Sequence, residues 1–357
     1  MEIGIYTFGD LPADARGPQA AQQRLREIVA AAQLADVAGL HVFGVGEHHR
    51  SDYAVSAHSV VLGAIAAVTR HIRLTSAVTI LSSADPVRVF EDFATLDLLS
   101  DGRAELMAGR GAFTESFPLF GFALQDYEAL YNEKLELLLK LRAHERMTWQ
   151  GQFRPALDGV EVSPRPLSGK LPIWIGAGGT PQSAVRAGQA GLPLNLANIG
   201  GEPARFKPFI DLYRTTGLAA GHAAEDLKVA VSGHLHVQKD SQRAREEFFP
   251  HYTHYMRHNL PQRDLGWAIS LADYAQLASP RGSLFVGSPQ EIADKILYEH
   301  TLFGHQRFLA QIDIGGLPFA KVAQVIELLA GDVLPLVHKA LGTPGRSRTA
   351  AALPSMA

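Results

Sequence analysis

The chain has 357 residues, of which 46% are hydrophobic and 19% charged, a composition typical of a globular protein with enough apolar surface for one large core. Its formal net charge of -3 gives neither the basic surface of a nucleic-acid-binding protein nor a bias toward membranes, so we expect small-molecule partners. Because it contains no cysteine, disulfide scaffolds, thiolate metal sites and cysteine nucleophiles are excluded.

The N-terminal residues run directly into an apolar segment. Residues 1–10 have no basic stretch and no long apolar run, so the sequence predicts neither a signal peptide nor a transmembrane helix. We therefore expect a cytoplasmic enzyme or binding protein.

Short apolar runs alternate with amphipathic helical stretches along the chain. The runs lack strict alternation and are bounded by Gly, Pro, Ser or Asp, as strands buried on both faces are. The predicted strands are Ile3–Phe8, His41–Gly46, Ile72–Ile80, Arg103–Ala108, Ile173–Ile175, Leu192–Leu196, Lys228–Val237 and Arg307–Ile312. The predicted helices are Gln19–Ala38, Ser56–Thr69, Pro86–Leu99, Tyr127–Trp149, Pro181–Gly188, Pro203–Tyr213, Ser241–Met256 and Pro318–Leu341. This order predicts an α/β fold, a closed parallel (β/α)₈ TIM barrel rather than an open sheet.

Two insertions interrupt the alternation. Gly109–Glu128 follows the fourth strand, and His258–Gly282 follows the helix of the seventh unit. A short strand over Leu284–Val286 then leads into a helix capped by Ser288. Insertions in such barrels usually form the rim of the active site. The sequence thus predicts one domain over residues 1–341, with insertions after strands 4 and 7, and a loosely ordered tail over 342–357.

Polar residues follow the second predicted strand. Glu47, His48 and His49 lie where side chains of an α/β barrel face the mouth of the active site. A carboxylate beside a histidine can orient the imidazole and raise its pKa, which would give a general acid or base near neutral pH. The alternative is that two of the fifteen histidines simply fall in a loop.

A glycine-rich segment joins the fifth strand to the next helix. Gly178 and Gly179 let backbone N–H groups approach an anion, and Thr180 and Ser183 add hydroxyl groups at the positive end of the helix. The next strand lacks the acidic residue of a dinucleotide site, so the phosphate of a mononucleotide fits better. Arg110, between two glycines, could reach the same phosphate. A ligand-free turn and an exposed arginine are the competing interpretation.

Histidines of the seventh unit are candidates for a metal site. His234 and His236 point to the same face of their strand, but no third ligand lies at a convincing position. His251, His254 and His258 have helical spacing, which fits a stripe facing the rim better than a metal site. We therefore predict no bound metal. The sequence also lacks a Gly-x-Ser-x-Gly motif, so it gives no support to serine hydrolysis.

Together these segments resemble the bacterial luciferase-like family of flavin-dependent monooxygenases, over nearly the whole chain up to Leu341. The order and spacing of several short motifs carry the resemblance. They are Glu47–His49, Thr75–Leu81, Asp85–Arg88, Asp97–Arg103, Gly109–Gly111, Phe120–Gly121, Ile173–Ser183 and Ala190–Pro193. The resemblance implies a barrel that binds FMN at the C-terminal ends of its strands.

The resemblance also implies roles for individual residues. His48 matches the histidine beside the reactive edge of the flavin, where it would transfer a proton or stabilise the species formed from reduced flavin and oxygen. Ala77 and Val78 match a pair that packs under the flavin ring, often through a cis peptide bond. The positions that bind the phosphate match Arg110, Gly179, Thr180 and Ser183, with Gly178 beside them. The sixth strand would bring Asn198, and also Asn195, near the ring.

This chain departs from the luciferase itself at three residues and in one longer segment. The luciferase has a glutamate and a serine in place of Gly179 and Thr180, and a cysteine in place of Gly109. Its long mobile lid has no obvious counterpart, although the insertion His258–Gly282 could replace it. Light emission from a long-chain aldehyde is therefore not implied.

The implied activity is monooxygenation of a small organic substrate with reduced FMN and O₂. No nicotinamide site is evident, so the reduced FMN would come from a separate flavin reductase. A homodimer is also implied, and the small apolar residues of Ser56–Thr69 and Pro86–Leu99 suit close packing across a two-fold interface.

Three alternatives stay open. The nearest is the deazaflavin-dependent branch of the same superfamily, which transfers hydride and does not use oxygen; Glu47, His48 and His49 favour the FMN branch. The second is a flavin-binding protein without turnover, against which His48 argues. The third is a metal-dependent barrel hydrolase that uses the histidine pairs.

Overall fold

The computed structural model describes residues 1–259 and 269–342, so part of the second predicted insertion and nearly all of the predicted tail lie outside the described residues. Eight parallel strands close into a ring, in which β10 pairs with both β9 and β12, and β12 pairs with β1. In barrel order they are β1 (Glu2–Thr7), β2 (Val42–Val45), β3 (Arg73–Ser76), β5 (Ala104–Gly109), β8 (Ile173–Ala177), β9 (Leu194–Ala197), β10 (Val229–Val237) and β12 (Arg307–Gln311). The predicted barrel is confirmed.

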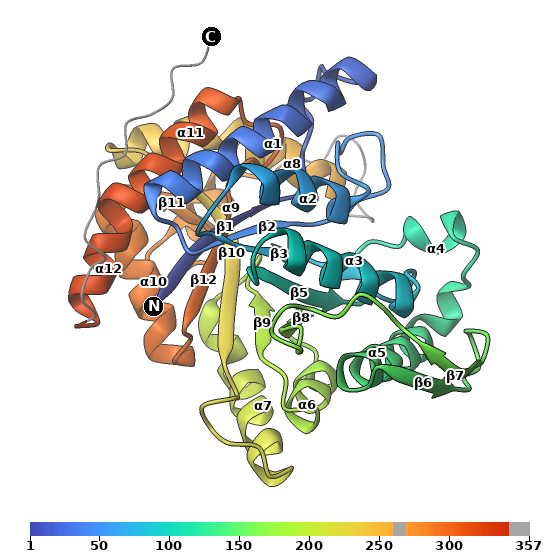
Figure 1. The fold of residues 1–357 in the computed structure, drawn as a ribbon. Helices are drawn as coiled ribbons and strands as arrows, with labels where there is room; N and C mark the ends of the chain where they lie inside the picture. Colours follow the sequence, from blue (N-terminus) through green and yellow to red (C-terminus); the bar gives the residue numbers. More distant parts are fainter. Residues whose placement is uncertain (260–268, 343–357) are drawn as a thin grey trace.

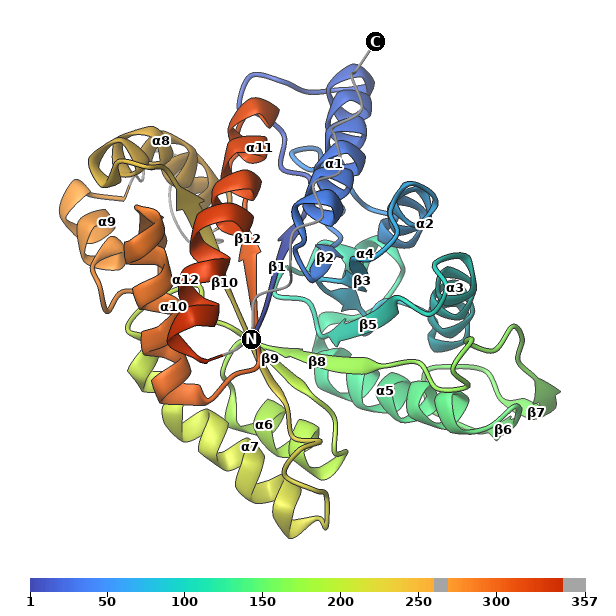
Figure 2. The same ribbon diagram turned by 60° about the vertical axis from the view of Figure 1, so that its left-hand side comes forward.

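Helices surround the strands (Figures 1 and 2). Local signals start them: Asp85 accepts hydrogen bonds from two backbone N–H groups of α3, and Ser288 and Glu291 form a capping box on α10. The helices are α1 (Pro18–Ala38), α2 (His58–Val68), α3 (Pro86–Leu99), α5 (Tyr127–Ala143), α6 (Pro181–Gln189), η2 (Pro203–Phe206), α7 (Lys207–Ala219), α8 (Ser241–Asn259), α10 (Pro289–Phe303), α11 (Phe319–Leu328) and α12 (Leu334–Ala340). Among the described residues, we find no helix with the length and apolarity that a membrane span requires.

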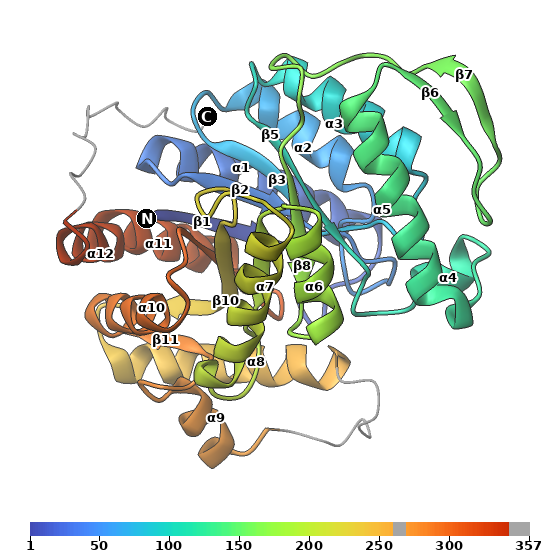
Figure 3. The same cartoon turned by 90° about the horizontal axis from the view of Figure 1, so that it is seen from below.

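The predicted helix Tyr127–Trp149 is wrong at its C-terminal end. Helix α5 ends at Ala143, and the following residues form strand β6 (Arg146–Trp149), which pairs antiparallel with β7 (Leu157–Glu161). Buried and exposed side chains alternate along β6, which is the period of a strand and not of a helix. The β6–β7 hairpin lies beside α5 (Figure 3) and is a further insertion that the sequence did not predict.

Two other predicted elements are interrupted. The run Ile72–Ile80 is divided into β3 and β4 (Thr79–Ile80) at the Ala77–Val78 peptide, which is cis, as the resemblance implied. The predicted helix Pro318–Leu341 is divided into α11 and α12 by a wider π-helical turn, Leu329–Val333. The apolar pattern thus predicts burial correctly but not where the backbone hydrogen bonding changes.

Both predicted insertions contain short helices. Gly109–Glu128 includes α4 (Ser116–Leu119) and the turn η1 (Leu124–Asp126). The described part of the second insertion includes α9 (Leu271–Ala278), and the expected short strand follows as β11 (Phe285–Gly287). The first insertion lies after β5, at the C-terminal end of the barrel.

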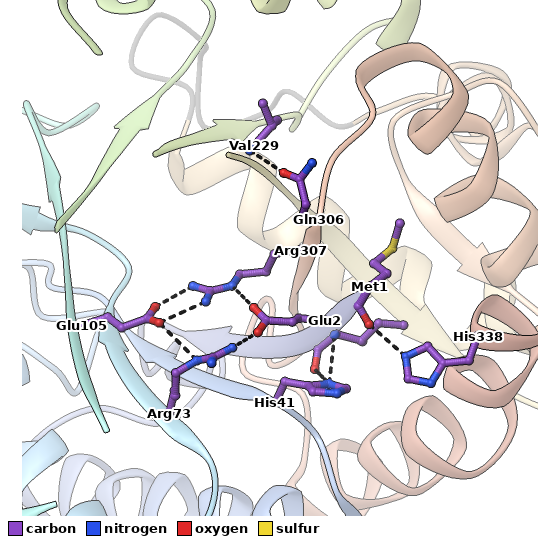
Figure 4. Close-up of polar contacts among 10 residues, drawn as sticks. Met1, Glu2, His41, Arg73, Glu105, Val229, Gln306, Arg307 and His338 are labelled. Carbon is purple, nitrogen blue, oxygen red and sulfur yellow. Dashed lines mark hydrogen bonds and ion pairs between the residues drawn. The ribbon is translucent and has the colours of Figure 1, made fainter. Parts of the chain in front are cut away.

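A charged network closes the N-terminal end of the barrel (Figure 4). Arg307 on β12 binds Glu105 on β5 (Nη1–Oε2 2.6 Å) and Glu2 on β1 (Nε–Oε2 2.8 Å). Arg73 on β3 pairs with the same two carboxylates. The Arg307 guanidinium lies 4.3 Å from the ring centre of Trp174 on β8. The network therefore ties several strands together where they begin.

Apolar side chains fill the middle of the barrel above this network. They are Tyr6, Val42, Ala77, Met107, Trp174, Ala230 and Leu309. A larger apolar cluster packs the outer face of the strands against the helices. Inside the barrel of the described structure, space for a ligand is therefore left at the C-terminal ends of the strands.

Candidate active site

A cavity of about 350 Å³ lies at the C-terminal ends of the strands. Its floor includes Tyr6, Met107 and Leu309 from the apolar filling of the barrel. Because parallel strands of a barrel all end at the same face, predicted site residues from distant segments meet here. Those that line the cavity are His48, Ala77, Val78, Arg110, Gly178 and Thr180.

Ala77 and Val78 form an apolar wall of the cavity. Val78 occupies space that two glycines leave open, because a Cβ atom on Gly109 would lie 2.5 Å and one on Gly176 would lie 2.6 Å from its side chain. A cysteine in place of Gly109 would therefore push Val78 away. Gly109, at which this chain departs from the luciferase pattern, thus leaves the space that the Val78 side chain fills.

Arg110 and two hydroxyl groups form a cradle at the start of α6. Arg110 Nη2 donates to Thr180 Oγ1 at 3.1 Å and to Ser183 Oγ at 3.2 Å, and the two hydroxyl oxygens are 2.8 Å apart. Gly179 has a φ of 100°, and a Cβ there would lie 2.5 Å from the Phe206 ring, so the turn requires glycine. A cation, two hydroxyl groups and a helix N-terminus favour an anion such as a phosphate.

A second arginine and a carboxylate lie next to the cradle, outside the lining of the cavity, and neither was predicted from the sequence. Arg186 Nη2 donates to Glu128 Oε2 at 3.0 Å, and Arg110 donates to the other oxygen of the same carboxylate. The Arg110 guanidinium lies over the Tyr127 ring and that of Arg186 over the Tyr131 ring. The one signal in the sequence is that Arg186 follows the predicted serine by one helical turn.

His48 lies in an aromatic cage on another part of the cavity wall. It is 4% exposed, and its ring centre is 4.8 Å from that of Phe8, 4.2 Å from that of Tyr53 and 4.9 Å from that of Phe113. Its Nδ1 is 2.8 Å from Oε1 of Glu115, which belongs to the first insertion. Stacking and a hydrogen bond together fix the orientation of this ring.

Of the two neighbouring histidines that Glu47 could orient, the structure places His49 and not His48 against its carboxylate. Glu47 Oε2 is 3.1 Å from His49 Nε2, and its other oxygen accepts a hydrogen bond from the Ile80 N–H at 2.6 Å. Burial raises the pKa of the Glu47 carboxyl, but the His49 hydrogen bond and the charge of His58 outweigh burial and hold the pKa below its ordinary value. The partner of His48 is 67 positions away in the chain, where no local pattern points to it.

Three buried polar side chains on the cavity wall have atoms without a hydrogen-bond partner in the described structure. These atoms are Asn195 Oδ1, His234 Nδ1 and both amide atoms of Gln311, on side chains that are 4%, 2% and 0% exposed. Burial lowers the pKa of His234 to about 3, so this ring is neutral. Because an unpaired buried polar group is unfavourable, these atoms fit a ligand with a polar edge, such as a flavin ring.

The structure does not bring Asn198 into the cavity. Its side chain is fully buried and donates to Glu299 Oε1 on α10 at 2.6 Å. Asn195 on the preceding strand β9 lines the cavity instead, because residues an odd number of positions apart point to opposite faces of an extended chain. The predicted ring contact of Asn198 therefore has no support in the geometry.

The histidine pairs considered for a metal are engaged in packing. His236 stacks on Phe248, with ring centres 5.2 Å apart, and its Nε2 is 3.0 Å from Glu247 Oε1. The His254 and His258 rings are 4.3 Å apart on α8. In the described ranges, no three His, Asp or Glu side chains form a group that could hold a metal ion.

Comparisons with known proteins agree with this geometry. Residues 1–306 match the family model of the luciferase-like monooxygenases. The oxygenase component of the flavin-dependent trigonelline monooxygenase from Acinetobacter baylyi is 23% identical over an alignment of 362 positions. This alignment covers 94% of this chain and 95% of that protein.

Two solved structures have the same fold. Monooxygenase RslO1 from Streptomyces bottropensis is 26% identical, with a TM-score of 0.81, and the match covers 94% of this chain and 99% of that one. The coenzyme F420-dependent tetrahydromethanopterin reductase from Methanopyrus kandleri is 19% identical, with a TM-score of 0.70 and coverage of 94% and 99%, a likeness of fold alone. The resemblance inferred from the motifs is confirmed, and the chain belongs to the luciferase-like monooxygenase family.

Proposed function

We propose that this protein is the oxygenase of a two-component flavin monooxygenase that acts on a small organic substrate. The observation that carries the proposal is the cradle of Arg110, Thr180 and Ser183 beside a cavity that His48 also lines. Bound reduced FMN would supply the two electrons with which one atom of O₂ enters the substrate and the other becomes water. A separate reductase is supported by the Acinetobacter relative, whose name describes it as an oxygenase component.

The residues of the cavity fit FMN part by part. Arg110 and the hydroxyl groups of the cradle would bind its phosphate. Ala77 and Val78 would support its ring on an apolar wall, and the unpaired amide atoms of Asn195 and Gln311 would meet polar atoms of the ring. The buried imidazole of His48 would hold or transfer a proton, away from bulk water.

The second candidate is hydride transfer with a deazaflavin. It is favoured by the likeness of fold to the reductase from Methanopyrus kandleri. FMN and the deazaflavin cofactor both carry a phosphate that the cradle could bind, so the cradle does not distinguish the two candidate functions. A cytoplasmic location and a homodimer stay predictions as well.

Titration of the purified protein with FMN, riboflavin and a deazaflavin tests the proposal. We expect FMN to bind, and Arg110→Ala to weaken its binding roughly 10- to 100-fold, the range of a hydrogen bond to a charged group. Riboflavin, which has no phosphate, should bind to wild type and variant alike. Arg88→Ala is the matched control, because this exposed arginine on α3 pairs with Glu91 and does not line the cavity. Tighter binding of the deazaflavin than of FMN would contradict the proposal.

A further inference from the structure

We propose that Glu115 is the positioning residue of His48. It holds the imidazole with Nδ1 as the hydrogen-bond donor, so that Nε2 is the nitrogen that exchanges a proton with the contents of the cavity. This inference rests on the proposed function, which gives His48 the proton-transfer role.

The contact between the two side chains is short and shielded from water. His48 Nδ1 and Glu115 Oε1 are 2.8 Å apart, and the side chains are 4% and 16% exposed. An ionised carboxylate has only acceptor atoms, so the hydrogen in this contact must be on Nδ1. In a neutral imidazole the other nitrogen then carries a free lone pair, which makes Nε2 the acceptor of protons.

Glu115 is ionised in this environment. Burial raises the pKa of its carboxyl, but the hydrogen bond from His48, a hydrogen bond from its own backbone N–H and the charge of Arg50 help to outweigh burial and hold the pKa below its ordinary value. The Arg50 guanidinium lies against two rings of the cage, 5.1 Å from the centre of Tyr53 and 5.5 Å from that of Phe113, and its Nη2 binds Asp52 at 2.6 Å. Among the ion pairs of the described residues, Arg50 pairs with Asp52 and Glu115 pairs with His48, so the Glu115 carboxylate is available to His48.

The aromatic cage fixes the plane of the His48 ring but does not determine which ring nitrogen carries the hydrogen. Tyr53 stacks on His48 with 29° between the ring planes, whereas Phe8 and Phe113 meet it at 59° and 67°. The side chains of these three residues have no carboxylate or carbonyl group that could accept a hydrogen bond from the imidazole. Within the described part of the chain, Nε2 of His48 has no hydrogen-bond partner, and the residue lines the cavity. Glu115 alone thus decides which nitrogen carries the hydrogen.

The first insertion fixes Glu115 in place through its neighbours. Glu115 directly precedes α4, and Phe117 in that helix is 1% exposed and stacks on Tyr127, with ring centres 5.5 Å apart. The Tyr127 hydroxyl in turn donates to the carbonyl oxygen of Gly111, at the start of the insertion. The carboxylate is therefore presented by an anchored segment.

Nitrogen NMR of protein labelled with ¹⁵N-histidine tests the inference without any turnover. His48→Ala identifies the His48 signals, and the spectra are recorded at a pH where the imidazole is neutral. We expect wild type to have a protonated Nδ1 and an unprotonated Nε2. Glu115→Gln should give a mixture of the two tautomers, because an amide can accept from Nδ1 through its oxygen or donate to it through its nitrogen.

Kinetics and binding give the second readout. Glu115→Gln should lower kcat about 10- to 100-fold, as loss of an orienting partner of a catalytic group does, with an FMN affinity within about twofold of wild type. Asp126→Asn, the same change of carboxylate to amide within the same insertion, should alter neither the tautomer nor kcat. A purely structural role of Glu115 would lower stability and leave the tautomer unchanged.

Two results would overturn the inference. One is a protonated Nε2 in the wild-type protein, which needs no variant to fold. The other is an unchanged kcat in a Glu115→Gln protein whose tautomers are mixed. If the protein binds no flavin but shows the expected tautomer, the proposed function fails while the positioning of His48 by Glu115 is supported.

Discussion

Two side chains of the candidate site, His48 and Arg110, each have an acidic partner in the first insertion. His48 is held by Glu115, and Arg110 is held by Glu128, which it shares with Arg186. The two carboxylates differ in exposure: the Glu115 side chain is 16% exposed and that of Glu128 is 51% exposed. A carboxylate that is shielded from water holds its partner in one orientation, whereas an exposed carboxylate is easily replaced by another anion.

This difference makes a prediction for Glu128. Glu128→Gln should tighten FMN binding roughly twofold to fivefold, because the phosphate no longer competes with an exposed ion pair worth up to about 1 kcal/mol. Riboflavin binding should not change. Glu136→Gln, an exposed carboxylate farther along α5 that pairs with Lys140, is the control. Weaker FMN binding in Glu128→Gln would mean instead that the carboxylate organises the two arginines for the phosphate.

Glu299, the buried partner of Asn198, makes stability depend on pH. Burial raises its pKa to about 8, against the opposing effects of the Asn198 hydrogen bond and the charge of Lys295. Burial also lowers the pKa of Lys295 to about 8, so below that pH a neutral acid lies beside a charged lysine. Between the ordinary pKa of 4.5 and about 8, only the folded state keeps the proton on Glu299, so its contribution to stability is lost as the pH rises.

The amide side chain of the Glu299→Gln variant is uncharged at every pH and so resembles the protonated carboxyl of Glu299. The free energy of unfolding of the variant relative to wild type should therefore grow by up to about 1.4 kcal/mol per pH unit between pH 5 and 8, and then level off. Denaturant unfolding at several pH values measures this difference. A difference that is constant with pH would show that Glu299 ionises normally in the folded protein.

At the scale of elements, the two ends of the barrel have different roles, one in stability and the other in ligand binding. The network of Arg307, Glu105, Glu2 and Arg73 lies where the strands begin, and the cavity lies where they end. The apolar filling of the barrel separates the two ends. Changes in the network should therefore affect stability without affecting the binding of ligands.

Glu105→Gln tests this separation. Because the change leaves Arg307 buried without its closest carboxylate, we expect a loss of about 3 kcal/mol in the free energy of unfolding. FMN affinity should stay within about twofold of wild type. Glu2→Gln is the control, since this side chain is 34% exposed and its ion pairs should contribute at most about 1 kcal/mol. An equal loss in the two variants would contradict the prediction.

The elements that the sequence predicts well are those whose burial is uniform. Strands buried on both faces are visible as continuous apolar runs, and the glycine-rich turn before α6 and Arg110 after β5 could be assigned from neighbouring residues. Strand β6 was missed because Arg146–Trp149 continues an amphipathic pattern that suits a helix. The partners Glu115 and Glu128 could not be predicted, because which residue of a rim insertion reaches the cavity depends on how the insertion folds back.

At the scale of the whole molecule, two neighbouring helices present apolar side chains to the outside. Helices α2 and α3 pack against each other on one side of the barrel (Figure 1). Their exposed apolar residues are Val60, Val68, Leu98 and Leu99, which are 72%, 41%, 43% and 64% exposed. Apolar groups on adjacent helices favour association, in keeping with the predicted homodimer.

Size-exclusion chromatography with light scattering measures the predicted dimer. We expect wild type to elute at twice the 38.6 kDa of one chain at micromolar concentration. Val60→Arg combined with Leu99→Arg should shift the protein to the monomer, because two charges in each copy would be buried without partners. Leu218→Arg changes a residue that is 54% exposed on α7, away from these helices, and should remain dimeric. A monomeric wild type would contradict the prediction.

The first insertion supplies walls to two parts of the same cavity, and this dual use limits how the protein can be redesigned. Arg110 and Glu128, near its two ends, pair at the cradle, while Phe113 and Glu115 between them contact His48. A redesign that rebuilds the whole insertion to admit a different substrate would therefore alter the contacts of Arg110 and of His48 together. The part of the wall with Ile199, after β9, comes from outside the first insertion. Libraries aimed at new substrates should therefore vary that wall and leave the insertion intact.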